Sequence, residues 1–168
     1  MFKTFFILTG YQITWLACVF GQTKLSQPLL GLYIGFIYII LFFYFNKHKI
    51  KSLKICLLIS IPGYFFDTLM VYFEIYQFNT VHNFIYLPIW MPILWLSFST
   101  LFDEILVFFK KYKLIGIFIS GLAGPITYYL GVPIGILTIS NTFIFFVFMI
   151  VFWVVLMTYY LELIISKY

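Results

Sequence analysis

The sequence predicts an all-α fold, a polytopic bundle of transmembrane helices. Hydrophobic residues make up 64% of the 168 positions, and charged residues only 9%. A soluble domain has about a quarter of its residues charged, so this chain has too few charges to cover a water-facing surface. Its apolar runs are long and continuous rather than alternating, which favours helices over the strands of a membrane β-barrel.

The same composition excludes several other classes. Two cysteines, Cys18 and Cys56, are too few for a secreted disulfide scaffold. All ten basic residues are lysines, so the chain has no arginine to form paired hydrogen bonds with guanine or phosphate. We therefore expect no nucleic acid as a partner, although the formal net charge is +5.

Six apolar segments are long enough, or nearly so, to cross a bilayer core, which needs about 20 helical residues. They are residues 5–20, 28–45, 55–77, 87–109, 114–130 and 143–165. Pro28 suits the first turn of the second helix. A turn is expected at 131–133, and residues 140–142 are expected to break the last apolar stretch. We expect residues 1–168 to form a single transmembrane domain.

The lysines predict the orientation of the helices. They cluster at residues 46–54 and 110–113, between apolar segments. If both loops are cytoplasmic, six crossings place both termini in the cytoplasm and leave only Lys24 outside. The expected location is therefore the inner membrane of a bacterium, with both ends of the chain inside.

Every acidic residue lies within an apolar segment, and Asp67 lies deepest. A central Asp costs about 2.5–3.5 kcal/mol on insertion scales, so we expect it to be buried among helices and either uncharged or paired. Glu74 follows seven residues later, which places it on the same face of an uninterrupted helix. Together they could serve as a proton relay, a cation site or a polar anchor, or Asp67 could be a neutral acid bonded to a neighbouring helix.

Two further groups in the fourth segment are candidate site residues. Asp103 and Glu104 lie near its expected cytoplasmic end, where they are either interfacial charges, a gate or a site for lipid headgroups. Trp95 lies deeper and is a candidate for a cavity wall. His48 and His82 are expected on opposite sides of the membrane, so we expect no metal site and no cofactor.

The fifth segment contains Gly124 and Pro125 near its middle. Proline removes a hydrogen-bond donor and crowds the carbonyl four residues earlier, here that of Gly121. We therefore expect the fifth helix to be interrupted at this point, with its backbone against the third or fourth segment. The freed carbonyl would then be a partner for Asp67 at a similar depth.

Short motifs of this chain resemble the DUF2878 family of small bacterial inner-membrane proteins. They are Gln12 to Trp15 with Val19 to Gly21, Gly63 to Asp67, Pro88 to Trp90 with Leu94, Trp95 and Phe98, and Gly124 to Tyr128 with Gly131 and Gly135. The motifs extend over most of the chain. The resemblance implies a bacterial inner membrane and points toward lipid metabolism, but the family itself has no assigned activity.

Three functions follow as expectations. The first is binding or handling of a lipid or small hydrophobic molecule within the bilayer, as an accessory subunit with membrane lipids and a membrane protein complex as partners. The second is a small proton-coupled transporter, or the substrate-binding membrane subunit of a larger one. The third, an enzyme that uses Asp67 as an acid, has least support, because no recognisable catalytic motif accompanies it.

The orientation can be tested with reporter fusions. A phosphatase that is active only outside the cytoplasm should be inactive when fused after Tyr168 and active when inserted in the uncharged connection 78–86. The reverse pattern would contradict the assignment of both termini to the cytoplasm.

Overall fold

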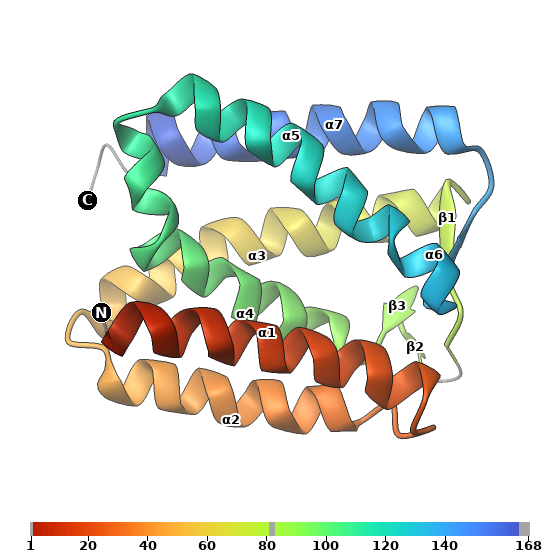
Figure 1. The fold of residues 1–168 in the computed structure, drawn as a ribbon, viewed down its shortest axis with the longest axis horizontal. Helices are drawn as coiled ribbons and strands as arrows, with labels where there is room; N and C mark the ends of the chain where they lie inside the picture. Colours follow the sequence, from red (N-terminus) through yellow and green to blue (C-terminus); the bar gives the residue numbers. More distant parts are fainter. Residues whose placement is uncertain (1, 81–82, 165–168) are drawn as a thin grey trace.

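The computed structural model describes residues 2–80 and 83–164, and they form a bundle of helices that lie side by side (Figure 1). The α-helices are α1 (Phe2–Thr23), α2 (Leu30–Phe45), α3 (Lys49–Tyr72), α4 (Met91–Glu104), α5 (Lys113–Tyr129), α6 (Gly131–Ile134) and α7 (Thr142–Tyr159). A 3-10 helix, η1 (Leu106–Lys110), follows α4, and a π-helix, η2 (Tyr160–Ile164), continues α7.

Four of the helical segments are long and apolar enough to cross a membrane. They are Lys3–Thr23, Lys49–Tyr72, Lys113–Ile134 and Thr142–Ile164, and α2 is a shorter apolar helix. A rise of 1.5 Å per residue makes α4 about 21 Å long, which is less than the bilayer core. The chain is thus a helical membrane protein by length and composition, and the number of six crossings stays a prediction.

The lysine-rich segments gather at one end of the bundle. The start of α1, the connection from α2 to α3, η1 and the end of η2 all lie there (Figure 1). Lys24, after α1, lies at the opposite end. Lys167 and the last residue of the chain are outside the described residues, as is His82. Which side of a membrane the lysine-rich end faces stays a prediction.

Helix α3 begins and ends earlier than the sequence predicts. It begins at Lys49, inside the expected basic loop, and ends at Tyr72. Glu74 has a left-handed backbone (φ 56°), and the amide of Ile75 donates to the carbonyl of Met70 (2.9 Å). This is the Schellman pattern that ends a helix. Glu74 is exposed in that turn, so the prediction that it shares a helical face with Asp67 is wrong.

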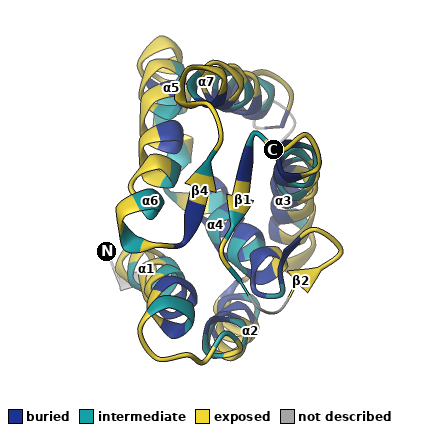
Figure 2. Ribbon diagram, turned by 90° about the vertical axis from the view of Figure 1, so that its right-hand side faces the viewer, coloured by how far each residue is buried: buried dark blue, intermediate teal, exposed yellow. Residues whose placement is uncertain are grey.

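Two small antiparallel ribbons add to the helices and were not predicted. Strand β1 (Tyr76–Phe78) pairs with β4 (Leu137–Ile139), so that Tyr76 lies opposite Ile139. Strand β2 (Asn83–Phe84) pairs with β3 (Leu87–Pro88). The β1–β4 ribbon lies at the end of the bundle, with α4 behind it (Figure 2). It holds Tyr76 fully buried.

The fourth segment also differs at its start. Residues 87–88 are a strand rather than the first turn of a helix, and α4 begins at Met91 with Pro92 in its first turn. An amide in the first turn of a helix has no carbonyl within the helix to bond, so the missing amide of Pro92 causes no kink.

The predicted break at 140–142 is confirmed, because Asn141 caps α7 by accepting a hydrogen bond from the amide of Ile144 (3.1 Å).

Glycines set the closest approaches between paired helices. A Cβ at Gly31 of α2 would lie 2.5 Å from the Cα of Cys18 in α1. A Cβ at Gly63 of α3 would lie 2.3 Å from the indole ring of Trp95 in α4. Small residues at such points let membrane helices pack tightly without a hydrophobic driving force between them.

Gly31→Ala should therefore destabilise the protein by about 1–3 kcal/mol, because the new methyl group would meet backbone that cannot move aside cheaply. Thermal unfolding in detergent measures the effect. Gly131→Ala is the matched control, because its Cβ would be 3.4 Å from the nearest side chain. Equal melting temperatures for the two variants would contradict the close packing of α1 on α2.

Candidate functional site

Asp67 of α3 lies in the interior of the protein with no exposed surface. Its Oδ1 accepts a hydrogen bond from the hydroxyl of Tyr76 (2.5 Å), and its Oδ2 accepts one from Nε1 of Trp95 (2.7 Å). The hydroxyl of Tyr128 lies within reach of both oxygens, at 3.0 Å from Oδ1 and 2.8 Å from Oδ2. Both oxygens of this carboxyl group are therefore satisfied by side chains.

The three donors come from three separate elements. Tyr76 is in the β1 strand, Trp95 is in α4 and Tyr128 is in α5. All three are neutral and donate toward an acceptor, an arrangement that suits a carboxylate group. Lysine-to-acid ion pairs instead join Lys3 to Glu104 and Lys113 to Glu162, at the lysine-rich end. Asp67 is thus the buried point at which α3, α4, α5 and the ribbon are joined.

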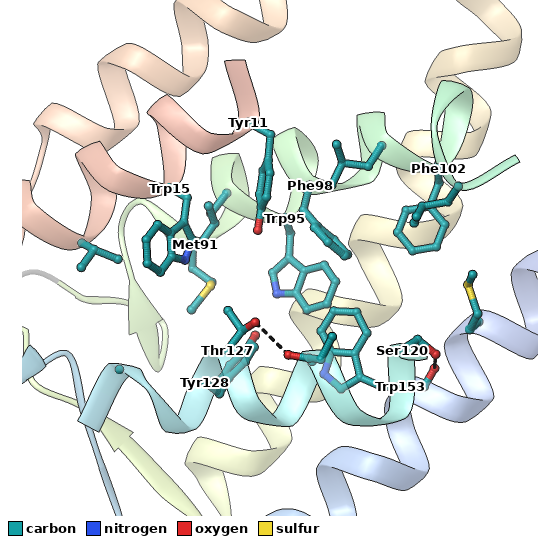
Figure 3. Close-up of a pocket in the computed structure, with 18 of the residues that line it drawn as sticks. Tyr11, Trp15, Met91, Trp95, Phe98, Phe102, Ser120, Thr127, Tyr128 and Trp153 are labelled. Atoms are coloured by element: carbon teal, nitrogen blue, oxygen red, sulfur yellow. Dashed lines mark hydrogen bonds between the residues drawn. The ribbon is translucent and has the colours of Figure 1, made fainter. Parts of the chain in front are cut away.

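Two of these donors, Trp95 and Tyr128, line a cavity of about 250 Å³. Asp67 itself does not line it. Its walls come from α1, α4, η1, α5, α6, α7 and the β1–β4 ribbon. Figure 3 shows the side chains of α1 and α4 facing those of α5 across it. Among the residues that the structure describes, no charged side chain lines it. Asp67 therefore acts on the cavity only through the residues that it holds in place.

All four tryptophans of the chain line this one cavity: Trp15, Trp90, Trp95 and Trp153. Trp95 and Trp153 stack with their ring centroids 5.8 Å apart and their planes at 21°. Phe98 packs edge-on against both, at 5.6 and 5.4 Å. Trp90 is fixed by a hydrogen bond from its Nε1 to Oε1 of Gln22 (2.7 Å). The wall is therefore a rigid set of aromatic faces rather than a lining of flexible aliphatic chains.

One side of the cavity is edged by exposed residues. Ile119, Ala123 and Thr127 of α5 line the cavity and are also exposed at the surface of the chain. They are spaced four residues apart, which places them along one edge of the helix. Trp15 and Tyr11 of α1 lie on the opposite wall (Figure 3). The cavity thus reaches the side of the bundle between α1 and α5.

Helix α5 continues through Gly124 and Pro125, so the predicted interruption is wrong. Proline is tolerated inside membrane helices where packing against neighbouring helices and small local adjustments compensate for the missing hydrogen bond. A Cβ at Gly124 would lie 2.3 Å from the indole of Trp153. The close approach here is therefore to α7, not to α3 or α4. The link from α5 to Asp67 is the Tyr128 hydroxyl rather than the carbonyl of Gly121.

The structure separates the remaining candidates from this region. Asp103 is half-buried at the lysine-rich end and accepts hydrogen bonds from Ser52 (2.5 Å) and from the side-chain amide of Asn46 (3.1 Å). Glu104 is exposed and pairs with Lys3. These contacts join helix ends to one another. Among the predicted site residues, Asp67, Trp95, Gly124 and Pro125 lie close to the cavity, with Trp95 and Gly124 in its wall.

Sequence reasoning missed Tyr76, Tyr128, Trp153 and Tyr11. The chain has 14 tyrosines and 23 phenylalanines, and these are expected mainly at lipid-facing and interfacial positions. Nothing in their spacing separates inward from outward ones. The only available signal was the buried acid itself, because a carboxyl group inside a membrane protein needs donors.

An apolar bundle with an internal aromatic cavity and one enclosed acid defines the class: a helical membrane protein with one candidate site inside the bundle. The chain belongs to the family described as a protein of unknown function, DUF2878, whose model matches residues 5–159. The resemblance predicted from its motifs is confirmed. No curated protein and no solved structure shows significant similarity to it.

Asp67→Asn should destabilise the protein by about 1–3 kcal/mol, because the amide nitrogen places a donor against groups that themselves donate. Tyr76→Phe is the comparison variant and should cost less, about 0.5–1.5 kcal/mol, since it removes one hydrogen bond and leaves the acceptor with other donors. Thermal unfolding of the purified proteins measures both. An Asn variant as stable as the original would contradict the role of Asp67 as the junction of these elements.

Proposed function

We propose that the protein binds a lipid or another small hydrophobic molecule from within the bilayer, in the cavity between α1 and α4 on one side and α5 and α7 on the other. The observation that carries this proposal is an apolar cavity of about 250 Å³ that is lined by every tryptophan of the chain. Apolar cavities with a few polar groups are the usual form of small-molecule sites. The protein would act as a binding or accessory subunit.

The position of the opening supports entry from the membrane. Ile119 and Ala123 belong to α5, one of the helices long and apolar enough to cross a bilayer. Their neighbour Leu122 is 45% exposed without lining the cavity. An opening along the side of such a helix faces acyl chains rather than water, so a hydrophobic ligand would reach the cavity without crossing an aqueous phase.

The fixed orientation of the aromatic side chains in the wall favours a ligand-binding site over side chains that pack only to stabilise the fold. Trp95 is held through Asp67 and Trp90 through Gln22. A preformed site loses little conformational entropy when a ligand enters it. Ordering these aromatic side chains in advance would therefore favour ligand binding.

Tryptophan fluorescence tests the proposal directly. Trp90, Trp95 and Trp153 are only 2%, 4% and 8% exposed, so a quencher in the bilayer reaches them efficiently only by entering the cavity. In vesicles with lipids brominated on the acyl chain, fluorescence should be strongly quenched. Ala123→Phe, which adds a ring at the edge of the cavity, should remove most of that quenching.

Leu122→Phe is the matched control, because it adds the same aromatic bulk one residue away, on the lipid-facing side of α5. It should leave quenching unchanged. A variant that keeps Trp95 and replaces the other three tryptophans with Phe should show the same quenching, and the same loss of quenching when Ala123→Phe is added. Equal quenching in the Ala123 and Leu122 variants would contradict entry of lipid through this side.

A further inference from the structure

Some polar groups of the cavity wall already donate a hydrogen bond within the protein, and others do not. Ser120 donates to the carbonyl of Ile117 (2.9 Å), Thr127 to that of Ala123 (2.8 Å) and Tyr128 to Asp67. Two donors of the wall have no hydrogen-bond partner among the residues that the structure describes: the hydroxyl of the half-buried Tyr11 and the buried Nε1 of Trp153. Figure 3 shows the Tyr11 side chain extending from α1 with its oxygen directed inward, toward Trp95.

A hydroxyl donor inside an apolar cavity favours a ligand that can accept its hydrogen bond. A buried donor without a partner is unfavourable, and a ligand acceptor would remove that penalty. A pure hydrocarbon would leave both the Tyr11 hydroxyl and the Trp153 Nε1 unsatisfied. An anionic headgroup would find no lysine in the wall, and a cationic one would find no exposed carboxylate, because Asp67 is enclosed behind Trp95 and Tyr128. The polar part of the ligand is therefore an uncharged acceptor.

The shape of the wall favours a flat group. The stacked pair of Trp95 and Trp153, with Phe98 edge-on to both, presents aromatic faces and edges at fixed angles. Aromatic groups gain stabilisation from such offset and edge-to-face contacts beyond the area that they bury. An apolar cavity of about 150 Å³ holds benzene, so one of about 250 Å³ has room for a single substituted ring.

We infer that the ligand is an uncharged ring carbonyl compound of the quinone class. Its ring packs against the aromatic wall of Trp95, Phe98 and Trp153, and one ring carbonyl accepts a hydrogen bond from the hydroxyl of Tyr11. Its apolar tail leaves through the side edged by Ile119 and Ala123 and continues into the bilayer. This inference rests on the proposed function, because it names the ligand of the same cavity.

Binding of two matched probes to the full chain in lipid nanodiscs tests the inference. A decyl-substituted benzoquinone carries the ring carbonyls, and decylbenzene has the same tail and ring size without them. Tyr11→Phe should weaken quinone binding roughly 3–10-fold, the value of one neutral hydrogen bond. It should leave decylbenzene binding unchanged. Quinone binding is followed by quenching of tryptophan fluorescence, and decylbenzene binding by its competition with brominated lipid.

The controls separate a lost hydrogen bond from a damaged fold. Tyr11→Phe keeps the ring that packs 5.6 Å from Phe98, so its melting temperature should match that of the original. Tyr33→Phe makes the same change at a residue of α2 that is 61% exposed and outside the cavity, and it should bind both probes as the original does.

The outcomes distinguish the two proposals. Equal binding of the two probes, with no effect of Tyr11→Phe, would overturn the quinone assignment and leave hydrophobic binding in place. A fatty acid methyl ester that binds in a Tyr11-dependent way while the quinone does not would also overturn it, in favour of an acyl ester. If neither probe binds and brominated lipid quenches the Ala123→Phe variant fully, the proposed function itself fails.

Discussion

The hydrogen bonds to Asp67 join three elements, β1, α4 and α5, at a single residue of α3. A carboxyl group inside an apolar bundle is unfavourable unless donors surround it, and here the donors come from β1, α4 and α5. Satisfying this one group therefore fixes the end of α3 against the ribbon, the rotamer of Trp95 and the approach of α5. Each donor thus links α3 to a different element of the fold.

The cavity is a consequence of this arrangement together with the glycine contacts. Gly63 lets the Trp95 ring lie close to α3, and Gly124 lets the Trp153 ring lie close to α5. Both indole rings are thereby held at the boundary between the two groups of helices, where they stack on each other. Large rigid rings at such a boundary leave space that aliphatic side chains would fill, and the space remains apolar because Asp67 does not line it.

The two ends of the bundle are built differently. At the lysine-rich end, Asp103 joins Asn46 and Ser52, and salt bridges connect Lys3 to Glu104 and Lys113 to Glu162. Such exposed pairs contribute little stability each. At the other end, the β1–β4 ribbon closes the cavity with backbone hydrogen bonds and supplies the buried Tyr76. Both ends contribute to the candidate site, because Leu106 and Phe109 of η1 line the cavity from the lysine-rich end.

Several features could be predicted from residues that act locally. Asn141 marks the start of α7 because its side chain caps the next turn, and long apolar runs mark the helices because period and length are local properties. The depth of Asp67 followed from counting residues along one helix. The end of α3 could not be predicted this way, since Glu74 is apolar-flanked and only the turn into β1 puts it in a left-handed conformation.

The sequence by itself determined the membrane class, most of the helices and the presence of a buried acid, because composition and hydrophobic runs depend on solvent rather than on partners. Only the tertiary structure decided which side chains satisfy Asp67 and that every tryptophan borders one cavity. Tyr11, Tyr76 and Tyr128 look like any other tyrosine in an apolar chain. Their roles depend on which helix faces which, and in a bundle where most surfaces are apolar the sequence does not encode that choice locally.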